Sequence, residues 1–564
     1  MNVKGREAQA MAGTSGMASE RTGGRLVVEA LEAQGVTRIS CVPGESYLPV
    51  LDALIDSGIE LDVCRHEAGA GNMAVAAGKL TGRAGVVAVT RGPGAMHAAI
   101  AVHTAQQDAL PMILLIGQVA LRDRGRGGFQ EMEYARVFGS TAKWVTSLDV
   151  VERIPETIAR AFRVAEGGRP GPVVIEMPED VLAEVAAARI PGRVEPMRAA
   201  PAPADIEALQ GIIARAERPI ALLGRSAWSQ EAADAAREFA ERYALPLAAG
   251  FRCQDYIDND AEVYVGHVGL GTDATLVARL EEADLILSVG GHFGDAETKG
   301  YEILAPRDGR AVAHVSNAEG DVDRYLQADL VVQATPLEFF RAMNAAAPEQ
   351  VGTARTDWMR ALREEEAHRS TPSAEGDLLS QAMAVLQREC GPDTIVANGA
   401  GNYAIWVHQF TKYRRYGAQL APASGAMGFG LPAGIAAGLH RPEQPVIVFA
   451  GDGCFSMSLT ELATLAESRA NVLVIVVNNG MYGTIRMHQE RRFPGRVSGT
   501  ALVNPDFVGI ALACGIPAER VEDVEAFERA FAQAQRGEGP SLIEIATDPD
   551  RSTPGLRLSE LSAG

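Results

Sequence analysis

The sequence predicts an α/β protein of three consecutive domains, each built on a mostly parallel sheet flanked by helices. The length of 564 residues is too great for one core at roughly 100–200 residues per domain. Continuous apolar runs alternate along the chain with longer Ala- and Leu-rich segments of helical period, a pattern typical of strands that are buried on both faces of a parallel sheet. Two stretches rich in Pro and Ala divide this pattern into three blocks.

These stretches give the expected domain boundaries. The second one carries a charged helical segment, DWMRALREEEAHR, at residues 357–369. We expect a flexible N-terminal tail at 1–20, a first domain at 21–190, a linker at 191–205, a central domain at 206–345, a linker at 346–377, a third domain at 378–550 and a C-terminal tail at 551–564.

Each block offers two clear strand candidates. They are residues 85–90 (GVVAVT) and 111–119 (PMILLIGQV), 219–224 (PIALLG) and 283–290 (ADLILSVG), and 445–451 (PVIVFAG) and 471–479 (NVLVIVVNN). Ligands of open parallel sheets bind at the carboxyl ends of the strands. The residues that follow these runs are therefore the first place to look for a site.

Composition excludes several classes of function. Lys and Arg number 52 against 72 Asp and Glu, which gives a net charge of −20 and makes nucleic acid and anionic membranes poor candidate partners. The six cysteines form no C-x-x-C pair, so neither a zinc site nor a disulfide framework is expected. No apolar run approaches the ~18 residues of a membrane span, and the N-terminus lacks a signal-peptide core. We expect a cytoplasmic protein that binds any anionic ligand locally.

The third block carries the strongest local pattern. Its first strand ends in Gly451-Asp452-Gly453, a helix with apolar residues at 459, 462, 463 and 466 follows, and the next strand ends in Asn478-Asn479. This is one βαβ unit, whose right-handed crossover brings both strand ends to one edge of the sheet. Asp452 and Asn479 should therefore converge.

Carboxylate and amide oxygens are ligands that suit Mg²⁺, and the two glycines allow backbone N–H groups to face a diphosphate. The unit predicts a metal-bridged diphosphate site. The ordinary alternative is that Asp452 caps a helix and that Asn-Asn-Gly is a simple turn.

Gly-Asp-Gly followed 27 residues later by Asn-Asn resembles the signature of thiamine diphosphate enzymes, and the chain resembles the large catalytic subunits of their acetolactate synthase-like members. The resemblance covers nearly the whole chain in family order. Its motifs are RHEAGAGNMA (65–74), TRGPGAMH (90–97), DALPMILLIGQV (108–119), GGFQE (127–131), AKWV (142–145), GAMGFGLPAGIAAG (425–438) and NNGMYGTIRMHQE (478–490). It implies a pyrimidine-binding first domain, a Rossmann-like central domain and a diphosphate-binding third domain.

The resemblance also implies roles for single residues. Mg²⁺ is expected on Asp452, Asn479 and the backbone carbonyl of Met481, and Met427 is expected beneath the V-shaped cofactor. Glu67 matches the catalytic carboxylate that contacts the pyrimidine ring, although from the residues alone a Glu at a helix start is usually a dipole-compensating cap. Further cofactor contacts are implied for Gly401, Asn402, Tyr403, Gly425, Gly451, Gly453, Cys454 and Tyr482.

The implied activity is decarboxylating carboligation of 2-oxo acids, namely two pyruvates giving 2-acetolactate and CO₂, in branched-chain amino acid biosynthesis. A decarboxylase, lyase or oxidase that acts on another 2-oxo acid or on an acyloin stays open, as does a non-catalytic subunit of the same fold. The implied assembly is a homodimer or homotetramer with the active site at a subunit interface, and a regulatory subunit stays open.

The substrate pocket is where the chain departs from the family. Gln118, Phe129, Gln130, Lys143 and His488 match pocket positions, but His488 replaces the family's tryptophan. His292 stands where the family has a basic residue near FAD, which leaves FAD binding open. The sequence assigns no role to the three histidines near the Glu67 and TRGPG segments, His66, His97 and His103.

Overall fold

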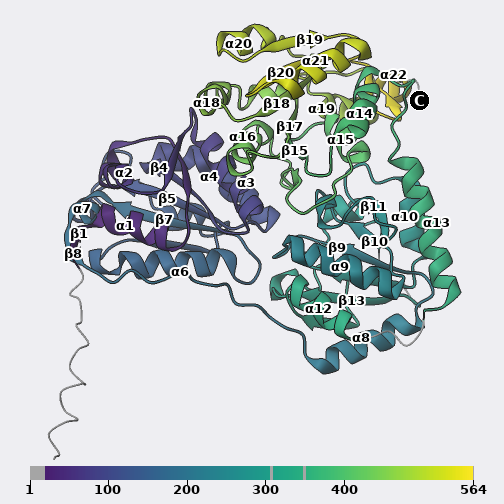
Figure 1. Ribbon diagram of the computed structural model, residues 1–564, viewed down its shortest axis with the longest axis horizontal. Helices are drawn as coiled ribbons and strands as arrows, with labels where there is room; N and C mark the ends of the chain where they lie inside the picture. The colour runs from purple at the N-terminus through teal and green to yellow at the C-terminus, as the bar shows by residue number, and fades with distance from the viewer. Residues whose placement is uncertain (1–18, 305–308, 347–350, 563–564) are drawn as a thin grey trace, which may run out of the picture.

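The protein folds into three α/β units, which Figure 1 shows in purple and blue, in teal, and in green and yellow. The computed structural model describes residues 19–304, 309–346 and 351–562. Each unit holds a six-stranded sheet with parallel pairing throughout, which confirms the predicted fold class. Residues 1–18 of the expected tail lie outside the described residues. Glu20 already belongs to a short strand, β1 (Glu20–Thr22), that pairs with β8 (Val185–Ala187).

The N-terminal sheet has the strand order β3-β2-β4-β5-β7-β6. Its strands are β2 (Arg38–Cys41), β3 (Glu60–Val63), β4 (Gly85–Thr90), β5 (Met112–Gln118), β6 (Trp144–Ser147) and β7 (Pro172–Pro178), and its helices are α1 (Gly23–Ala33), α2 (Leu48–Ile55), α3 (Glu67–Thr81), α4 (Arg91–Asp108), α5 (Tyr134–Phe138), α6 (Ile154–Glu166) and α7 (Glu179–Ala183). The two predicted strands are present with ends shifted by at most one residue, because their apolar runs are buried on both faces.

The central sheet has the order β11-β10-β9-β12-β13-β14. Its strands are β9 (Pro219–Leu223), β10 (Leu247–Ala249), β11 (Tyr264–His267), β12 (Leu285–Val289), β13 (Ala311–Ser316) and β14 (Leu330–Gln333), and its helices are α8 (Pro203–Arg215), α9 (Gln230–Tyr243), α10 (Ala274–Glu282), α11 (Asp295–Thr298) and α12 (Pro336–Ala345). Counted along the chain this is 3-2-1-4-5-6, the doubly wound order of Rossmann domains. Helix α13 (Thr353–Arg369) lies in the expected second linker.

The C-terminal sheet has the order β16-β15-β17-β18-β20-β19. Its strands are β15 (Ile395–Asn398), β16 (Gln419–Leu420), β17 (Val446–Gly451), β18 (Val472–Asn478), β19 (Ala518–Val521) and β20 (Ser541–Ala546), and its helices are α14 (Leu378–Glu389), α15 (Tyr403–Phe410), α16 (Gly430–His440), α17 (Asp452–Ser456), α18 (Glu461–Ser468), α19 (Gly483–Arg492), α20 (Phe507–Ala513) and α21 (Val524–Arg536). Counted along the chain, this order repeats that of the N-terminal sheet.

The two outer units share one hydrophobic core. Helix α3 packs against α16, and the two helices lie at the boundary of the purple and green units in Figure 1. Small residues permit the close approach of these layers. A Cβ at Gly71 would lie 2.5 Å from the Ala101 methyl group of α4, and a Cβ at Gly434 would lie 2.1 Å from Val448 of β17. The Gly- and Ala-rich helices are thus required by packing.

Two expected elements differ in the structure. The helix predicted around 459–466 is α18, which begins only at Glu461, so Leu459 lies in the turn that separates α18 from α17, a short helix that was not predicted. Helix α17 packs on the sheet and α18 on α16. The expected C-terminal tail at 551–564 is folded over its described part as a hairpin of β21 (Arg551–Thr553) and β22 (Leu556–Arg557) followed by α22 (Leu558–Ser562) against α19. The other domain boundaries stay predictions. Among the described residues, no helix has the length and apolar character that a membrane span requires.

Candidate active site

Asp452 lies where β17 ends and α17 begins, and its side chain is buried in a set of donors. Oδ1 accepts the N–H of Gly453 at 2.9 Å, while Oδ2 accepts the N–H of Gly480 at 2.9 Å and the amide of Asn504 at 2.7 Å. Burial raises the pKa of Asp452 above its ordinary value, and these donated hydrogen bonds oppose that shift. The aspartate is therefore held in one orientation at the strand edge.

The Asn-Asn pair reaches the same edge because β18 lies beside β17. The side-chain oxygen of Asn479 accepts the N–H of Met481 at 3.2 Å, in a turn where Gly480 has φ +69°. Asn478 donates its amide to Glu544 at 2.7 Å, while its side-chain oxygen accepts the N–H of Gly480 at 3.1 Å. The structure thus brings Asp452 to the turn that carries Asn479 and Met481, as predicted, and their carboxylate, amide and carbonyl oxygens suit a hard divalent cation.

Asn504 is a site residue that sequence reasoning missed. Its amide donates to Asp452 and also, at 2.9 Å, to the side-chain oxygen of Asn478. It lies in an irregular segment 52 residues after Asp452, where no periodicity or glycine pattern marks it.

Glycines at the strand edge leave no room for side chains. A Cβ at Gly453 would lie 2.5 Å from the ring of Tyr482, and one at Gly451 would lie 2.9 Å from the ring of Tyr403. Any other residue would push these rings away from the Asp452 turn. The turn therefore offers backbone and oxygen ligands with little bulk, which fits a diphosphate bound through a metal.

The loop that contains the predicted cofactor contacts Gly401, Asn402 and Tyr403 is fixed largely by its own side chains. Gly401 has φ +146°, Asn402 donates to Ser552 and accepts from Thr484, and the Tyr403 hydroxyl accepts the N–H of Gly399. The side chains of Asn402 and Tyr403 thus stabilise the loop, and only backbone groups are left to face a ligand. Cys454 lies behind it, buried, with its sulfur accepting the N–H of Gly428 at 3.3 Å.

Met427 lies between two glycines with left-handed backbone, Gly425 at φ +69° and Gly428 at φ +81°. Its side chain is partly buried against the C-terminal core. A Cβ at Gly428 would lie 2.9 Å from Cβ of Met457, so glycine is required there on both steric and conformational grounds.

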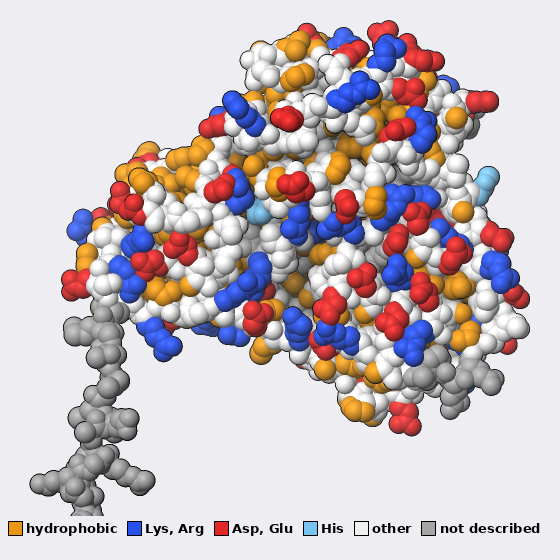
Figure 2. Space-filling model, viewed as in Figure 1, with side chains coloured by type: hydrophobic (Ala, Val, Ile, Leu, Met, Phe, Trp, Pro, Cys, Tyr) orange, Lys and Arg blue, Asp and Glu red, His pale blue; other side chains and the backbone are white. Residues whose placement is uncertain are grey.

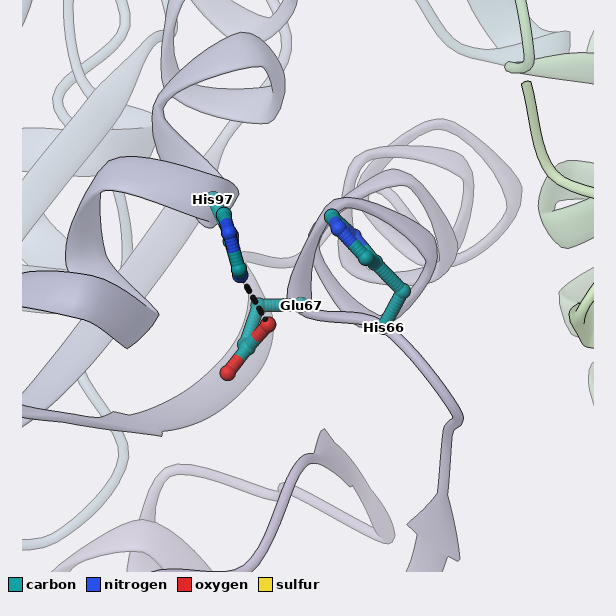
Figure 3. Close-up of side chains that lie close together, drawn as sticks. All are labelled: His66, Glu67 and His97. Carbon is teal, nitrogen blue, oxygen red and sulfur yellow. Dashed lines mark hydrogen bonds and ion pairs between the residues drawn. The ribbon is translucent and has the colours of Figure 1, made fainter.

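Glu67 is the first residue of α3, four residues beyond the end of β3. Its side chain is 14% exposed, and Oε2 lies 2.8 Å from Nδ1 of His97 on α4 (Figure 3). The structure therefore places the predicted carboxylate at the strand edge of the N-terminal sheet, against a histidine to which the sequence assigned no role.

Glu461 is a second residue that sequence reasoning missed. It is fully buried on α18, and its carboxylate accepts the backbone N–H groups of Arg65 at 3.2 Å and His66 at 2.9 Å. A Cβ at Gly69 would lie 2.4 Å from Glu461 Oε1. The turn that carries Glu67 is thus fixed by a carboxylate of the C-terminal unit, and burial raises the pKa of Glu461.

Three of the five predicted pocket residues, Gln118, Phe129 and Gln130, lie close to one another in the structure. Gln118 is buried and bonds the carbonyl of Met132, while Phe129 is exposed. The carbonyl of Gln130 accepts the N–H of Gly92 in the first turn of α4. These three therefore lie in or against one loop, 129–132, which contacts the start of the helix that carries His97.

The other two pocket residues lie elsewhere. Lys143 precedes β6 and so lies at the amino ends of the strands of the N-terminal sheet, where it donates to the carbonyl of Gly167. His488 is exposed on α19 of the C-terminal unit. In the described part of the chain, no hydrogen bond or ion pair joins Glu67 to Asp452 or Asn479.

Two sheets of one topology thus carry Glu67 near one strand edge and the oxygen atoms of Asp452 and Asn479 at another, an arrangement that suits a cofactor-dependent enzyme. Models of three thiamine pyrophosphate enzyme domains match the chain: the N-terminal thiamine pyrophosphate-binding domain at 21–137, the central domain at 206–343 and the C-terminal thiamine pyrophosphate-binding domain at 399–545. The chain belongs to the thiamine pyrophosphate (thiamine diphosphate) enzymes.

Similar proteins narrow the class. The chain is 30% identical to the acetolactate synthase isozyme 2 large subunit of Escherichia coli, over 93% of this chain and 95% of the relative. It is 30% identical to the acetolactate synthase large subunit of Parasynechococcus marenigrum, over 93% and 87%, and 29% identical to the acetolactate synthase of Bacillus subtilis, over 93% of each. It is a thiamine diphosphate-dependent enzyme of the transferase or lyase type that closely resembles acetolactate synthase large subunits.

Proposed function

We propose that the protein is a Mg²⁺-dependent decarboxylating carboligase of acetolactate synthase type, which joins two pyruvates into 2-acetolactate with loss of CO₂. The observation that carries the proposal is the convergence of Asp452 with the Asn479–Met481 turn at one strand edge, in a chain that also presents Glu67 at the start of α3. A non-catalytic subunit would have no need of either feature.

The proposed mechanism assigns one task to each residue. When bound, thiamine diphosphate supplies a thiazolium carbon that adds to the 2-oxo acid and accepts the electrons released with CO₂. Asp452, Asn479 and the Met481 carbonyl would hold the Mg²⁺ through which the diphosphate binds, and Met427 would support the cofactor. Glu67 exchanges a proton with the pyrimidine ring nitrogen and so sets the state of the neighbouring amino group.

We also propose a homodimer or homotetramer in which Glu67 of one subunit serves the cofactor bound at Asp452 of another. Exposed large hydrophobic side chains support this assembly, since they are frequent on the outer units. They include Leu48, Ile55, Met96, Ile100, Phe129, Met457, Ile485, Phe493 and Val503. Figure 2 shows hydrophobic side chains along the upper edge of the N-terminal unit, in the region of α2. Light scattering should give at least twice the chain mass, and a monomer with full activity would refute the shared site.

Nothing in the described part of the central sheet indicates FAD. The glycines that follow β9 and β12 lie in close contact, because a Cβ at Gly224 would lie 2.3 Å from the carbonyl oxygen of Gly290. The buried Arg225–Glu297 ion pair, at 2.9 Å, covers the same edge. We propose activity without flavin, and we expect purified protein without yellow flavin absorbance to be fully active.

Product analysis over a panel of 2-oxo acids tests the activity. With thiamine diphosphate and Mg²⁺, pyruvate should give acetolactate. Free aldehyde from pyruvate, or turnover confined to another 2-oxo acid or an acyloin, would support the decarboxylase, lyase or oxidase alternative. The exposed His488, which replaces the family's tryptophan, favours that alternative. Absence of turnover on the whole panel would contradict both.

A further inference from the structure

Two histidine rings lie against the Glu67 carboxylate. His66 immediately precedes α3, and His97 lies in the second turn of α4. Their ring centroids are 4.5 Å apart with an interplanar angle of 28°, and Figure 3 shows Glu67 below the gap between the rings. Three titratable groups from two helices thus meet at the residue to which the proposed function assigns proton exchange.

The hydrogen bonds of the two rings give them different roles. Nδ1 of His66 accepts the N–H of Ala68 at 3.1 Å, so this ring caps α3 and carries its proton on Nε2 when neutral. Nδ1 of His97 lies 2.8 Å from a carboxylate oxygen, which can only accept, so His97 donates from Nδ1. His66 therefore serves the helix backbone, and His97 serves Glu67.

Helix α4 is shaped to bring His97 to this position. Gly94 and His97 are three residues apart and share one face of the helix. A Cβ at Gly94 would lie 3.2 Å from Cβ of Val89, a tight contact, and 3.4 Å from Glu67 Oε1, so glycine lets α4 lie close to β4 beside the carboxylate. Arg91 begins the helix with φ +41°, an uncommon backbone for a residue with a side chain, which fixes how α4 leaves β4.

The two oxygens of Glu67 are consequently not equivalent. Oε2 is bonded to His97, whereas in the described part of the chain no hydrogen bond is made to Oε1. A carboxylate that is bonded at one oxygen has a fixed rotation and offers the other oxygen to a ligand. The side chain of Glu67 is 14% exposed, against 54% for His97, so the imidazole is also the better solvated of the two groups.

We propose that His97 is a positioning residue for Glu67: its Nδ1–H fixes Oε2 and leaves Oε1 for the pyrimidine ring nitrogen of the cofactor. Because the proton of His97 sits on Nδ1, its Nε2 is free to exchange protons with solvent, and the pair forms a short path from solvent to the carboxylate. This inference rests on the proposed function, which makes Glu67 the proton-exchanging group.

Two variants of His97 separate positioning from packing. His97→Asn keeps an N–H donor at the place of Nδ1, and His97→Leu keeps bulk without a donor. His103→Leu is the matched control, because His103 is also an exposed histidine of α4. The first readout is the rate of deuterium exchange at the thiazolium C2 of the bound cofactor, which needs no substrate. The second is the ¹⁵N spectrum of labelled histidine in cofactor-free protein, which reports the tautomer directly.

We expect His97→Leu to slow C2 exchange about 10- to 100-fold, the value of one charge-assisted hydrogen bond. His97→Asn and His103→Leu should stay within about threefold of the parent, and cofactor affinity should change by less than about threefold in all variants, since the diphosphate is bound elsewhere. The ¹⁵N spectrum should show His97 protonated at Nδ1, and Glu67→Gln should alter that signal.

Three results would overturn the proposal: equal exchange rates in His97→Leu and the parent, equal losses in His97→Leu and His97→Asn, or a His97 proton on Nε2 in the parent. A transition metal bound by the parent and lost from His97→Leu would also overturn it, because the three side chains offer ligand atoms within 4.8 Å of one another. If Glu67→Gln itself left C2 exchange unchanged, the proposed function would fail. If Glu67→Gln abolished exchange and His97→Leu did not, only the role of His97 would fail.

Discussion

The N-terminal and C-terminal sheets have the same strand order, yet their carboxyl edges carry different chemistry. The C-terminal sheet places Asp452 after its third strand, and a turn with Asn479 after its fourth. At the equivalent places the N-terminal sheet has Thr90, at the end of β4, and Gln118, at the end of β5, with Glu67 supplied by the helix after its second strand. One scaffold thus presents the proposed metal ligands in one copy and the proposed proton-exchanging carboxylate in the other.

The carboxylates of Asp452 and Glu67 also differ in their hydrogen bonds. Asp452 accepts hydrogen bonds from three neutral amide donors at both of its oxygens, whereas Glu67 contacts an imidazole at one oxygen only. Asp452 is thus held in place at both of its oxygens, whereas Glu67 is held at one and offers the other to a ligand. The comparison teaches that sheet topology determines where a site lies, and that the residues near the strand ends determine the chemistry of the site.

Removal of the proton-exchanging carboxylate should give the largest effect. Glu67→Gln keeps the shape of the side chain, and we expect turnover to fall about 10²- to 10⁴-fold, the usual worth of a general acid–base group. Steady-state rates on pyruvate measure the loss. Glu179→Gln, a change of another glutamate at a helix start in the same unit, is the control, and a variant Glu67→Gln with full turnover would contradict the assignment.

Loss of the missed amide at the other edge should weaken metal binding. Asn504→Ala leaves Asp452 without its shortest hydrogen bond, and we expect Mg²⁺ affinity to fall about 10- to 100-fold, as for other residues that orient metal ligands. Titration of Mg²⁺ against cofactor binding measures the change. The matched control is Asn471→Ala at the far end of β18, and similar Mg²⁺ affinity in the two variants would show that Asn504 does not orient Asp452.

Glu461 connects the two edges, and its removal should affect stability more than chemistry. Glu461→Ala leaves the N–H groups of Arg65 and His66 without an acceptor, which we expect to cost about 1–3 kcal/mol of unfolding free energy. Chemical denaturation measures the cost. Glu467→Ala, an exposed glutamate of the same helix that pairs with the Arg65 side chain, should cost less than about 1 kcal/mol. Equal costs would mean that the turn before Glu67 does not depend on Glu461.

The smallest expected effect concerns pH. His408 is buried between the C-terminal and central units, bonded to Gln254 and Gln419, and burial holds its pKa well below 6.5. The unfolded chain therefore binds more protons below that pH, so stability is complete above pH 6.5 and decreases as the pH falls. We expect the loss to be about 1 kcal/mol per pH unit.

The variant His408→Gln should lose part of this dependence. Asp108, whose burial raises its pKa to about 6, acts in the opposite direction in both proteins and cancels in the comparison. Unfolding curves at several pH values give the two slopes. Identical slopes would show that His408 is not the group responsible.

Features that depend on local sequence pattern could be predicted from the sequence alone. The strands at 85–90, 219–224 and 445–451 are found within one residue of their predicted ends, because continuous apolar runs are unambiguous in a buried parallel sheet. The convergence of Asp452 with the turn at Asn479 followed from the handedness of one βαβ unit. Glu67 and Met427 were assigned through family resemblance, and their roles stay predictions.

What the sequence could not supply depends on contacts between distant segments. Glu461 bonds backbone groups 395 and 396 residues away, and Asn504 acts from an irregular segment with no pattern of its own. The short helix α17, which was not predicted, likewise depends on its packing against β17 and β18. The contact of His97 could not be predicted for the same reason, since it depends on the neighbouring helix α3, which places Glu67 beside the imidazole.

The central claim is that the two edges have separate tasks, anchoring at Asp452 and proton exchange at Glu67. Calorimetric affinity for thiamine diphosphate in the presence of Mg²⁺ tests it most directly, with Asp452→Asn and Glu67→Gln compared side by side. We predict that Asp452→Asn loses at least about 100-fold in affinity. Glu67→Gln should bind within about threefold of the parent while turnover collapses. Strong cofactor binding by Asp452→Asn together with loss of binding by Glu67→Gln would contradict the claim.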